Sequence, residues 1–334
     1  MPRERSPRAA PAVPPDGPGT VATVGTFDGV HAGHREVLEE IGRRGRERGL
    51  RSLLVTFDRH PLEVVRPDDA PPLLTTPDEK KELLALTGVD CVAFLPFTRS
   101  LSLYQPEEFV REVLVRRFRV EELVIGYDHG FGRGRSGDTG TLRELGRELG
   151  FDVDVVEKVQ VGTDPVSSTR IRHLLAEGRV EEARECLGRP YSLQGPVVHG
   201  MGRGRDLGFP TANIDPPGDR KLIPAPGIYA ARARVRDELR EGILHAGPRP
   251  TFTGAPATLE LYLLDFEGDI YGEPVRVDFL KRLREVRSFS STDELVAEMR
   301  RDRERAREYF ERHPGGARSV REATGGLQDP DEKI

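Results

Sequence analysis

Apolar positions between residues 19 and 159 alternate between short continuous runs and longer stretches in which they recur at helical spacing. Such runs are typical of strands buried on both faces, and the intervening stretches read as amphipathic helices. Because strands and helices alternate along the chain, this region is predicted to form a parallel sheet with helical crossovers, a Rossmann-like α/β fold. The expected strands lie within residues 20–30, 50–58, 89–97, 121–128 and 151–159, and the expected helices within residues 33–49, 76–88, 106–118 and 141–150.

After about residue 187 the pattern changes to period-two alternation between turns that contain glycine and proline. Alternation of this kind is typical of half-buried antiparallel strands, so we expect a small antiparallel β-barrel or sandwich. One amphipathic helix, over residues 292–310, follows the strands, with Ser291 or Thr292 as its cap. The second half of the chain is therefore predicted to be a barrel domain with a C-terminal helix.

The 334 residues are enough for two separate hydrophobic cores. We place the α/β domain at residues 19–186 and the barrel domain at residues 187–312. Residues 1–18, which include six prolines, and residues 313–334 carry few apolar side chains and are expected to be disordered tails.

Charge and cysteine content narrow the class of protein. The chain has 51 Lys and Arg against 56 Asp and Glu, and its arginines alternate with acidic residues as on solvated helix faces. No nucleic-acid partner is therefore expected. No apolar run approaches a membrane span, the first residues do not resemble a signal peptide, and Cys91 and Cys186 form no CxxC pair. These features predict a cytoplasmic protein without a membrane partner; they do not indicate an oligomeric state.

The most informative segment is GTFDGVHAGH, residues 25–34, where a predicted parallel strand ends and a helix begins. Ligands bind at the carboxyl ends of parallel strands, and a helix N-terminus presents free N–H groups to phosphate. Histidines on either side of Gly33 can face the same phosphates. Two histidines that only cap or pack the helix are the alternative. The candidate nucleotide-binding residues are Gly25, Thr26, Phe27, Asp28, His31 and His34.

A second candidate phosphate contact lies in VSSTRIR, residues 166–172. Ser167 or Ser168 would cap the following helix. The N-terminus of that helix, together with the Arg170 guanidinium, is suited to bind a triphosphate. An ordinary capped helix with surface arginines is the alternative. The glycine-rich segment over residues 125–138 lacks the GK[ST] of a Walker A motif, so an anion-binding lid and a plain flexible loop both remain open.

The barrel region contains GFPTAN, residues 208–213, after the glycine-rich residues 200–205. Thr211 and Asn213 alternate in an extended segment, so their side chains face one way and offer oxygen ligands suited to Mg²⁺ with nucleotide phosphate. Glu260, on a predicted strand, can accept a proton from an attacking hydroxyl. A turn that merely enters a strand and a solvent-facing glutamate are the respective alternatives.

GTFDGVHxGH, GxDxxFGxxRxGD and SSTRIR, in this order, resemble the adenylyltransferase module of the prokaryotic bifunctional riboflavin kinase/FAD synthetases. VVHGMGRGRDLGFPTANI, GIYAARARV, GPRPTF, LELYLLDFEGDIYG and VRVDFLKRLRE resemble the riboflavin kinase module of the same family. Together the two resemblances cover about residues 19–312. They imply an enzyme that phosphorylates riboflavin with ATP to FMN and then adenylylates FMN to FAD, releasing pyrophosphate.

The resemblance also implies roles for single residues. In the kinase module, Thr211 and Asn213 would hold Mg²⁺ with ATP, and Glu260 would be the base for the riboflavin 5′-hydroxyl. In the adenylyltransferase module, His31, His34 and Arg170 would be catalytic. Further ATP contacts are implied for Ser168 and Thr169 in that module and for Gly202, Gly208 and Pro210 in the kinase module; flavin contacts in the adenylyltransferase module are implied for Phe57, Asp128 and Phe131.

Several positions depart from the family's usual sequence. His245 stands where an asparagine is usual, and Val286 and Ser288 replace an acidic and a basic residue in the region that borders the kinase flavin pocket. His129 and Gly130 replace an aromatic and a basic residue in the glycine-rich loop. Two alternatives follow for the function: an FAD synthetase with a degenerate kinase domain, or a flavin-binding protein without catalysis.

Overall fold

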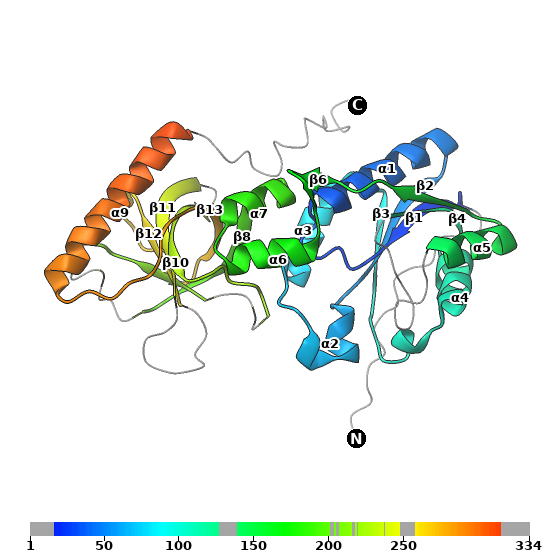
Figure 1. The fold of residues 1–334 in the computed structure, drawn as a ribbon, viewed down its shortest axis with the longest axis horizontal. Coiled ribbons are helices and arrows are strands. Elements are labelled where there is room, and N and C mark those ends of the chain that lie inside the picture. Colours follow the sequence, from blue (N-terminus) through cyan, green and yellow to red (C-terminus); the bar gives the residue numbers. More distant parts are fainter. Residues whose placement is uncertain are drawn as a thin grey trace, which may run out of the picture. The chain divides into compact units, whose positions relative to one another are not determined.

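The computed structural model describes most of the chain and divides it into two packing units (Figure 1). The described residues are 17–126, 139–200, 204, 207–215, 218, 220–236, 238–247 and 258–314. Among these, the first unit contains residues 17–71 and 75–166, and the second contains residues 72–74 and 167–314.

The first unit is built on a five-stranded parallel sheet with the order β3-β2-β1-β4-β5. The chain moves outward from β1 to β3 and then returns to the other side of β1, so β1 and β4 form the switch point of the sheet. This topology confirms the predicted Rossmann-like arrangement. The strands are β1 (Thr20–Val24), β2 (Arg51–Phe57), β3 (Cys91–Leu95), β4 (Val120–Gly126) and β5 (Asp152–Val156).

Helices cover both faces of this sheet, because successive residues of each buried strand point to opposite sides. Val21 and Leu54 pack against α1 (Ala32–Arg48) on one face, whereas Ala22 and Leu53 belong to the core under α4 (Pro106–Phe109) on the other. The remaining helical segments are α2 (Pro61–Val65), α3 (Pro77–Ala85), the π-helix η3 (Val110–Arg117), α5 (Thr139–Leu149) and the 3₁₀ turns η1 (Pro67–Asp69) and η2 (Leu101–Leu103).

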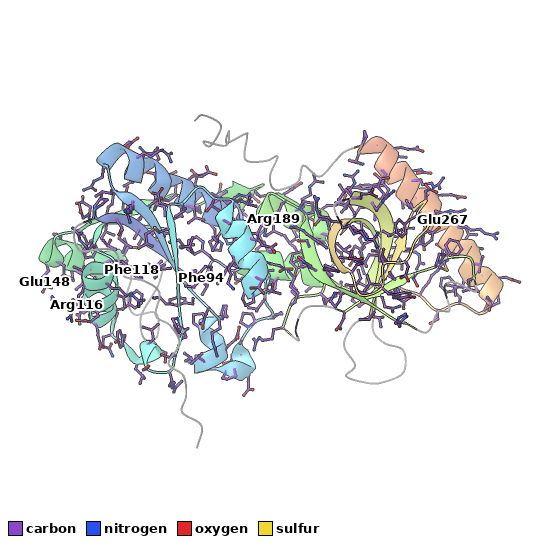
Figure 2. All side chains as sticks on the ribbon, turned by 180° about the vertical axis from the view of Figure 1, so that it is seen from behind. Phe94, Arg116, Phe118, Glu148, Arg189 and Glu267 are labelled. Carbon is purple, nitrogen blue, oxygen red and sulfur yellow. The ribbon has the colours of Figure 1, made fainter. Side chains whose placement is uncertain are left out.

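Figure 2 illustrates the separation of apolar and charged side chains in this unit. Phe118 is buried and Phe94 packs on the opposite core, while Arg116 and Glu148 lie at the surface. The predicted helix over residues 106–118 exists, but its second half is π-helical rather than α-helical. The short helix α2 and the hairpin of β6 (Gln160–Val161) with β7 (Asp164–Pro165) were not expected from the sequence.

The second unit contains a closed antiparallel barrel with the strand order β10-β11-β12-β9-β8-β13. The C-terminal helix packs on its outer face, where Tyr309 and Phe310 contact Ile228 and Ile243. A barrel with a C-terminal helix was predicted, and the structure selects it over a sandwich. The elements are β8 (Tyr191–Val198), β9 (Ala212–Ile214), β10 (Gly227–Val235), β11 (Glu238–Gly247), β12 (Thr258–Leu263), β13 (Pro274–Arg284) and α9 (Thr292–Arg312), the last capped by Ser291.

Two helices that precede the barrel in the chain pack with it. These are α6 (Ser168–Ala176) and α7 (Val180–Leu187). The amide of Ala225 donates to the carbonyl of Leu175 at 2.9 Å, and the Arg282 guanidinium donates to the carbonyl of Glu177 at 3.4 Å. By packing, the chain therefore divides before Ser167. The functional boundary between residues 186 and 187 remains a prediction.

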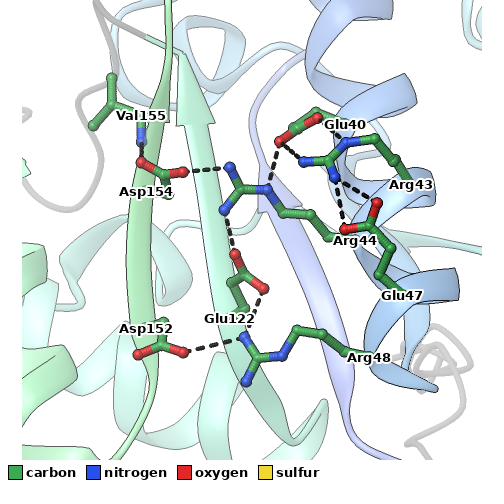
Figure 3. Close-up of polar contacts among 9 residues, drawn as sticks. All are labelled: Glu40, Arg43, Arg44, Glu47, Arg48, Glu122, Asp152, Asp154 and Val155. Carbon is green, nitrogen blue, oxygen red and sulfur yellow. Dashed lines mark hydrogen bonds and ion pairs between the residues drawn. The ribbon is translucent and has the colours of Figure 1, made fainter.

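A buried carboxylate ties α1 to the sheet (Figure 3). Glu122 on β4 is 4% exposed and pairs with Arg44 and with Arg48, the latter at 2.7 Å. Asp154 on β5 also pairs with Arg44, and Asp152 pairs with Arg48 at 3.1 Å. Because Glu122 accepts from two guanidinium groups, its burial is compensated, and α1 is held in one register against β4 and β5.

We therefore expect Glu122→Gln to lower the free energy of unfolding by about 2 kcal/mol, since it leaves two arginines without their shared buried carboxylate. Urea denaturation monitored by circular dichroism measures this loss. Glu47→Gln on α1 is the control, because the Glu47 side chain is 58% exposed and its substitution should change stability by about 0.5 kcal/mol or less. Equal effects of the two variants would contradict a special role for Glu122 in holding α1 against the sheet.

Candidate active sites

The turn between β1 and α1 is unusually constrained. Phe27, Gly29 and Val30 all have positive φ angles, of 50°, 85° and 38°. For a β-branched residue such as Val30 this backbone conformation is strained. The Phe27 and Val30 side chains are buried in the core below α1, which compensates the strain. The turn places the N-terminus of α1 directly after the carboxyl end of β1, beside the switch point of the sheet.

The two predicted histidines lie together in this turn. His31 is the N-cap of α1, and its Nδ1 accepts the amide hydrogen of His34 at 3.3 Å. Their rings stack with centroids 3.6 Å apart, and the Phe27 ring lies 4.5 Å from that of His34. Because His31 Nδ1 is an acceptor, a neutral His31 carries its proton on Nε2. The pair thus presents adjacent imidazole edges at a helix N-terminus.

Gly33, between the histidines, has room for a Cβ at ordinary van der Waals distance from its surroundings. A Cβ at this position would lie 3.4 Å from the His31 ring and 3.9 Å from the carbonyl oxygen of Val166. The next residue, Ser167, is the N-cap of α6, with its Oγ accepting from the amide of Arg170. The sequence offered Ser167 and Ser168 as caps, and the structure selects Ser167.

Asp28 holds the turn in place. Its Oδ1 accepts from the amide and the hydroxyl of Thr75, at 3.0 and 3.1 Å, and the Thr75 hydroxyl accepts from the amide of Gly29 at 3.1 Å. Asp28 and Thr75 are both buried. Sequence reasoning proposed Asp28 as an ATP contact and missed Thr75, which read only as part of the segment before a helix.

Lys80 is a second residue that sequence reasoning missed. Its ammonium group is buried and donates to the carbonyl oxygens of Phe57 at 2.7 Å and Thr26 at 3.3 Å, at the carboxyl ends of β2 and β1. Burial lowers the pKa of Lys80, and the nearby carboxylate of Asp28 opposes this shift. The Phe57 ring packs edge-on against Phe97 at 5.0 Å, beside these carbonyls. Lys80 therefore adds a buried cation beside the turn.

Other predicted residues belong to the second unit or lie outside the described part of the chain. Ser168, Thr169 and Arg170 form the first turn of α6, which belongs to the second unit, and their action together with the histidines remains a prediction. Asp128, His129, Gly130, Phe131 and Gly202 lie outside the described residues.

In the barrel, three candidate side chains share one face of adjacent strands. Asn213 on β9 pairs in register with Glu260 on β12, and Glu260 pairs with His245 on β11. Directly opposed residues of antiparallel strands project to the same side, about 5 Å apart. All three are half-buried. The structure therefore brings the predicted base beside a predicted Mg²⁺ ligand, and adds His245 on the other side of the base.

Glycines in the preceding loop lie against the two candidate Mg²⁺ ligands. A methyl group on Gly200 would collide with the Asn213 amide, and one on Gly204 would lie 3.1 Å from the Thr211 hydroxyl. Of the ATP contacts proposed nearby, Gly208 has a φ angle of 79°, and Gly208 and Pro210 are exposed beside buried Phe209. The loop backbone therefore approaches the Thr211 and Asn213 side chains as closely as glycine permits.

A charge network borders this row of side chains. Arg284 at the end of β13 pairs with buried Asp302 of α9 at 2.6 Å, and buried Glu298 pairs with Arg305 at 3.1 Å. Burial and the charge of Arg284 lower the pKa of His245, and Glu260 opposes this shift. His245 is thus biased toward the neutral form beside the predicted base. Sequence reasoning read the arginines of α9 only as a solvated face.

The departures Val286 and Ser288 lie in the exposed segment between β13 and α9. Val286 is 41% exposed, and Phe289 is half-buried with the Arg287 guanidinium 5.0 Å from its ring centre. Because this segment is exposed, Val286 and Ser288 do not alter the core of the barrel.

The donor set fits Mg²⁺ carried by a nucleotide. Thr211 and Asn213 offer only neutral oxygens, and the described residues contain no cluster of three or more His, Cys, Asp or Glu side chains that would form a self-sufficient metal cage. Mg²⁺ in phosphoryl-transfer sites is commonly held by few protein ligands together with phosphate oxygens and water.

Comparison with known proteins also divides the chain into two modules. A family model for FAD synthetase matches residues 13–170, and one for riboflavin kinase matches residues 187–310. The bifunctional riboflavin kinase/FMN adenylyltransferase of Escherichia coli K12 is 39% identical over 293 residues, which cover 87% of this chain and 93% of the relative. The chain belongs to the bifunctional riboflavin kinase/FMN adenylyltransferase family. The Listeria monocytogenes enzyme of the same description is 37% identical, covering 87% of this chain and 92% of that protein.

A solved structure supports the fold of this riboflavin kinase/FMN adenylyltransferase family member. The crystal structure of a Streptococcus pneumoniae protein described as a macrolide-efflux protein matches with a TM-score of 0.80 and 31% identity, covering 89% of this chain and 95% of that one. The family and fold class predicted from the sequence are thus confirmed. Within the described part of the chain, no helix is long and apolar enough to cross a membrane.

In the riboflavin kinase module, Gly200→Ala should displace the Asn213 side chain. If Asn213 holds Mg²⁺ as predicted, riboflavin phosphorylation should fall at least tenfold, because the reacting phosphate is then less well positioned. Steady-state assays at several Mg²⁺ concentrations measure the effect, which extra Mg²⁺ should partly reverse. Gly42→Ala on α1 is the control, since a methyl group there would lie at an ordinary 3.5 Å from Arg46. Unchanged kinase activity of Gly200→Ala would contradict the proposed role of Asn213.

In the adenylyltransferase module, Lys80→Met should lower the free energy of unfolding by about 1–3 kcal/mol, because two buried carbonyls lose their donor. It should also reduce FMN adenylylation while riboflavin phosphorylation persists. The neighbouring Lys81→Met is a matched control, since the Lys81 side chain is 58% exposed and pairs only locally with Asp78. If both variants behaved alike, Lys80 would have no special role in the turn.

Proposed function

We propose that this chain phosphorylates riboflavin to FMN with one ATP and adenylylates FMN to FAD with a second ATP, releasing pyrophosphate. The observation that carries the proposal is that two groups of polar side chains, in two parts of one chain, each lie inside the matching family model. The stacked His31 and His34 lie within the FAD synthetase match, and the pair Asn213 and Glu260 lies within the riboflavin kinase match.

In the kinase module, the Glu260 carboxylate takes the proton of the riboflavin 5′-hydroxyl, and the resulting oxygen attacks the γ-phosphorus of ATP. The bond from that phosphorus to the β-phosphate oxygen breaks, and ADP leaves. Thr211 and Asn213 would hold Mg²⁺, which when bound neutralises phosphate charge. The register pairing of Asn213 with Glu260 supports this assignment, because directly opposed residues of adjacent strands project to the same face.

In the adenylyltransferase module, an oxygen of the FMN phosphate attacks the α-phosphorus of ATP, and the bond to the pyrophosphate oxygen breaks. The attacking phosphate monoester is already anionic, so no strong base is required. His31, His34 and Arg170 stabilise charge that grows on the transferring and leaving phosphates, with the N-terminus of α1 adding donors. The stacked imidazoles and the Thr75 contacts of Asp28 support a fixed geometry for this turn.

The other proposed contacts complete the two sites. ATP contacts are proposed for Gly25, Thr26, Phe27, Asp28, Ser168 and Thr169 in the first module and for Gly202, Gly208 and Pro210 in the second, with flavin contacts from Phe57, Asp128 and Phe131. We also propose a cytoplasmic location. His245 is neutral beside Glu260 in this scheme and takes the place of the usual asparagine.

The direct test is chromatography of the flavins formed from riboflavin, ATP and Mg²⁺, with a parallel reaction that starts from FMN. The proposal expects FMN and FAD from riboflavin, and FAD from FMN. FAD formed only from FMN would support an FAD synthetase with a degenerate kinase domain. Flavin bound without any product would support a non-catalytic flavin-binding protein.

Glu260→Gln should lower the rate of riboflavin phosphorylation by about 100-fold or more, because it removes the proton acceptor. It should leave the rate of FMN adenylylation unchanged. The double variant His31→Ala/His34→Ala should show the reverse pattern, with loss of donors to the transferring phosphate. Initial rates for the two reactions, measured separately, test both. Full kinase activity in Glu260→Gln would contradict its role as base, and joint loss of both activities in either variant would indicate misfolding.

A further inference from the structure

Phe209 attaches the segment before β9 to the barrel. It is 4% exposed, although its neighbours Gly208 and Pro210 are exposed. Its amide donates to the carbonyl of Gly204 at 2.8 Å, and its ring packs edge-on against the Tyr262 ring of β12 with 5.4 Å between the ring centres. An aromatic ring buried between exposed neighbours is the natural anchor of such a segment.

The C-terminal helix α9 also contacts this ring. The Arg303 guanidinium lies 5.7 Å from the centre of the Phe209 ring, and Arg303 is half-buried. The preceding residue, Asp302, is buried and accepts from Arg284 of β13 through both carboxylate oxygens, at 2.6–3.0 Å. Because this ion pair fixes α9 against β13, the backbone that carries Arg303 is fixed as well. A cation over an aromatic ring is attracted to it, more strongly where water is partly excluded.

The two predicted Mg²⁺ ligands are held differently. Asn213 belongs to β9 and is paired in register with Glu260 of β12 on one side and with Val198 of β8 on the other. Thr211 precedes β9, and among the described residues no register pair of that strand includes it. The strand pairing that sets the position of Asn213 therefore ends before Thr211.

Thr211 is packed instead against the turn that Phe209 closes. A Cβ on Gly204 would collide with the carbonyl oxygen of Phe209 and would lie 3.1 Å from the Thr211 hydroxyl oxygen. The Gly204 backbone thus lies close to both residues. Because the three are packed together, a displacement of Phe209 is passed on to the Thr211 side chain.

We infer that Arg303 of the C-terminal helix and the Phe209 ring position the Thr211 hydroxyl for nucleotide-bound Mg²⁺ in the kinase site. The inference rests on the proposed kinase function and deepens it, and every contact that carries it lies within the second unit. Arg303 and Phe209 are positioning residues, which do not touch the reacting groups but act through the segment that carries Thr211. Phosphoryl transfer depends chiefly on positioning and charge neutralisation, so a displaced ligand lowers the rate although the base is unchanged.

The first test needs no ligand, because hydrogen–deuterium exchange of the full chain reports how firmly residues 207–215 are held. Arg303→Met removes the cation but keeps an unbranched side chain, and we expect about fivefold faster exchange in this peptide. Arg303→Lys, which keeps a cation, should restore most of the protection. Arg312→Met is the control on the same helix, because the Arg312 side chain is 73% exposed and pairs with Glu308 one turn away. Unchanged exchange in Arg303→Met would overturn the inference.

The second test compares initial rates of riboflavin phosphorylation and of FMN adenylylation. At limiting Mg²⁺, Arg303→Met should lower phosphorylation about fivefold, and saturating Mg²⁺ should reverse most of the loss, because Thr211 is misplaced rather than removed. FMN adenylylation should stay within about twofold of the wild type. A loss that Mg²⁺ does not reverse, or an equal loss in both reactions, would contradict the positioning of a Mg²⁺ ligand.

A double-mutant cycle tests whether Arg303 acts through Phe209. If it does, Arg303→Met combined with Phe209→Leu should phosphorylate riboflavin no more slowly than Phe209→Leu alone. Additive losses would overturn the inference. A wild-type chain that forms no FMN from riboflavin would instead refute the proposed kinase function, and the exchange experiment would still decide whether Arg303 holds the segment.

Discussion

The turn between β1 and α1 is the constraint on which the first site depends. Its positive-φ residues are stable only because Phe27 and Val30 are buried and because Asp28 and Gly29 are bonded to Thr75. This arrangement directs the N-terminus of α1, with its capping histidine, toward the switch point of a parallel sheet. The predicted anion binding there would follow from the fold itself, since a helix N-terminus and two histidines come together without a dedicated phosphate loop.

The predicted kinase site in the barrel depends on a different structural feature, the face shared by adjacent strands. Period-two alternation places Asn213, Glu260 and His245 in one row across three strands, while their neighbours Leu259 and Leu261 are buried in the barrel. Glycine at position 200 lets the preceding loop lie against Asn213. In the proposed scheme one chain therefore uses ATP twice, at a helix N-terminus in one unit and at a strand face with a glycine-rich loop in the other.

The sequence predicted the features that depend on local pattern: the alternation of strands and helices, the barrel, and the family. For each of two helix caps it offered two neighbouring residues, of which the structure selects Ser167 and Ser291. It did not reveal Lys80, because a Lys-Lys pair on an amphipathic helix reads as solvent-exposed, although Lys80 is buried under two strand ends. Thr75 and the packing of α6 and α7 on the barrel were missed for a related reason. They are defined by contacts between residues far apart in the chain, which no single-sequence pattern records.

The central claim is that one chain carries two separable active sites, one in each module. Mixing the Glu260→Gln variant with the His31→Ala/His34→Ala variant, and supplying riboflavin, ATP and Mg²⁺, tests it most directly. Each variant keeps the site that the other lacks, so the account predicts that FAD forms from riboflavin in the mixture although neither variant makes it alone. FMN that accumulates without FAD, or a mixture that forms neither product, would contradict two independent sites.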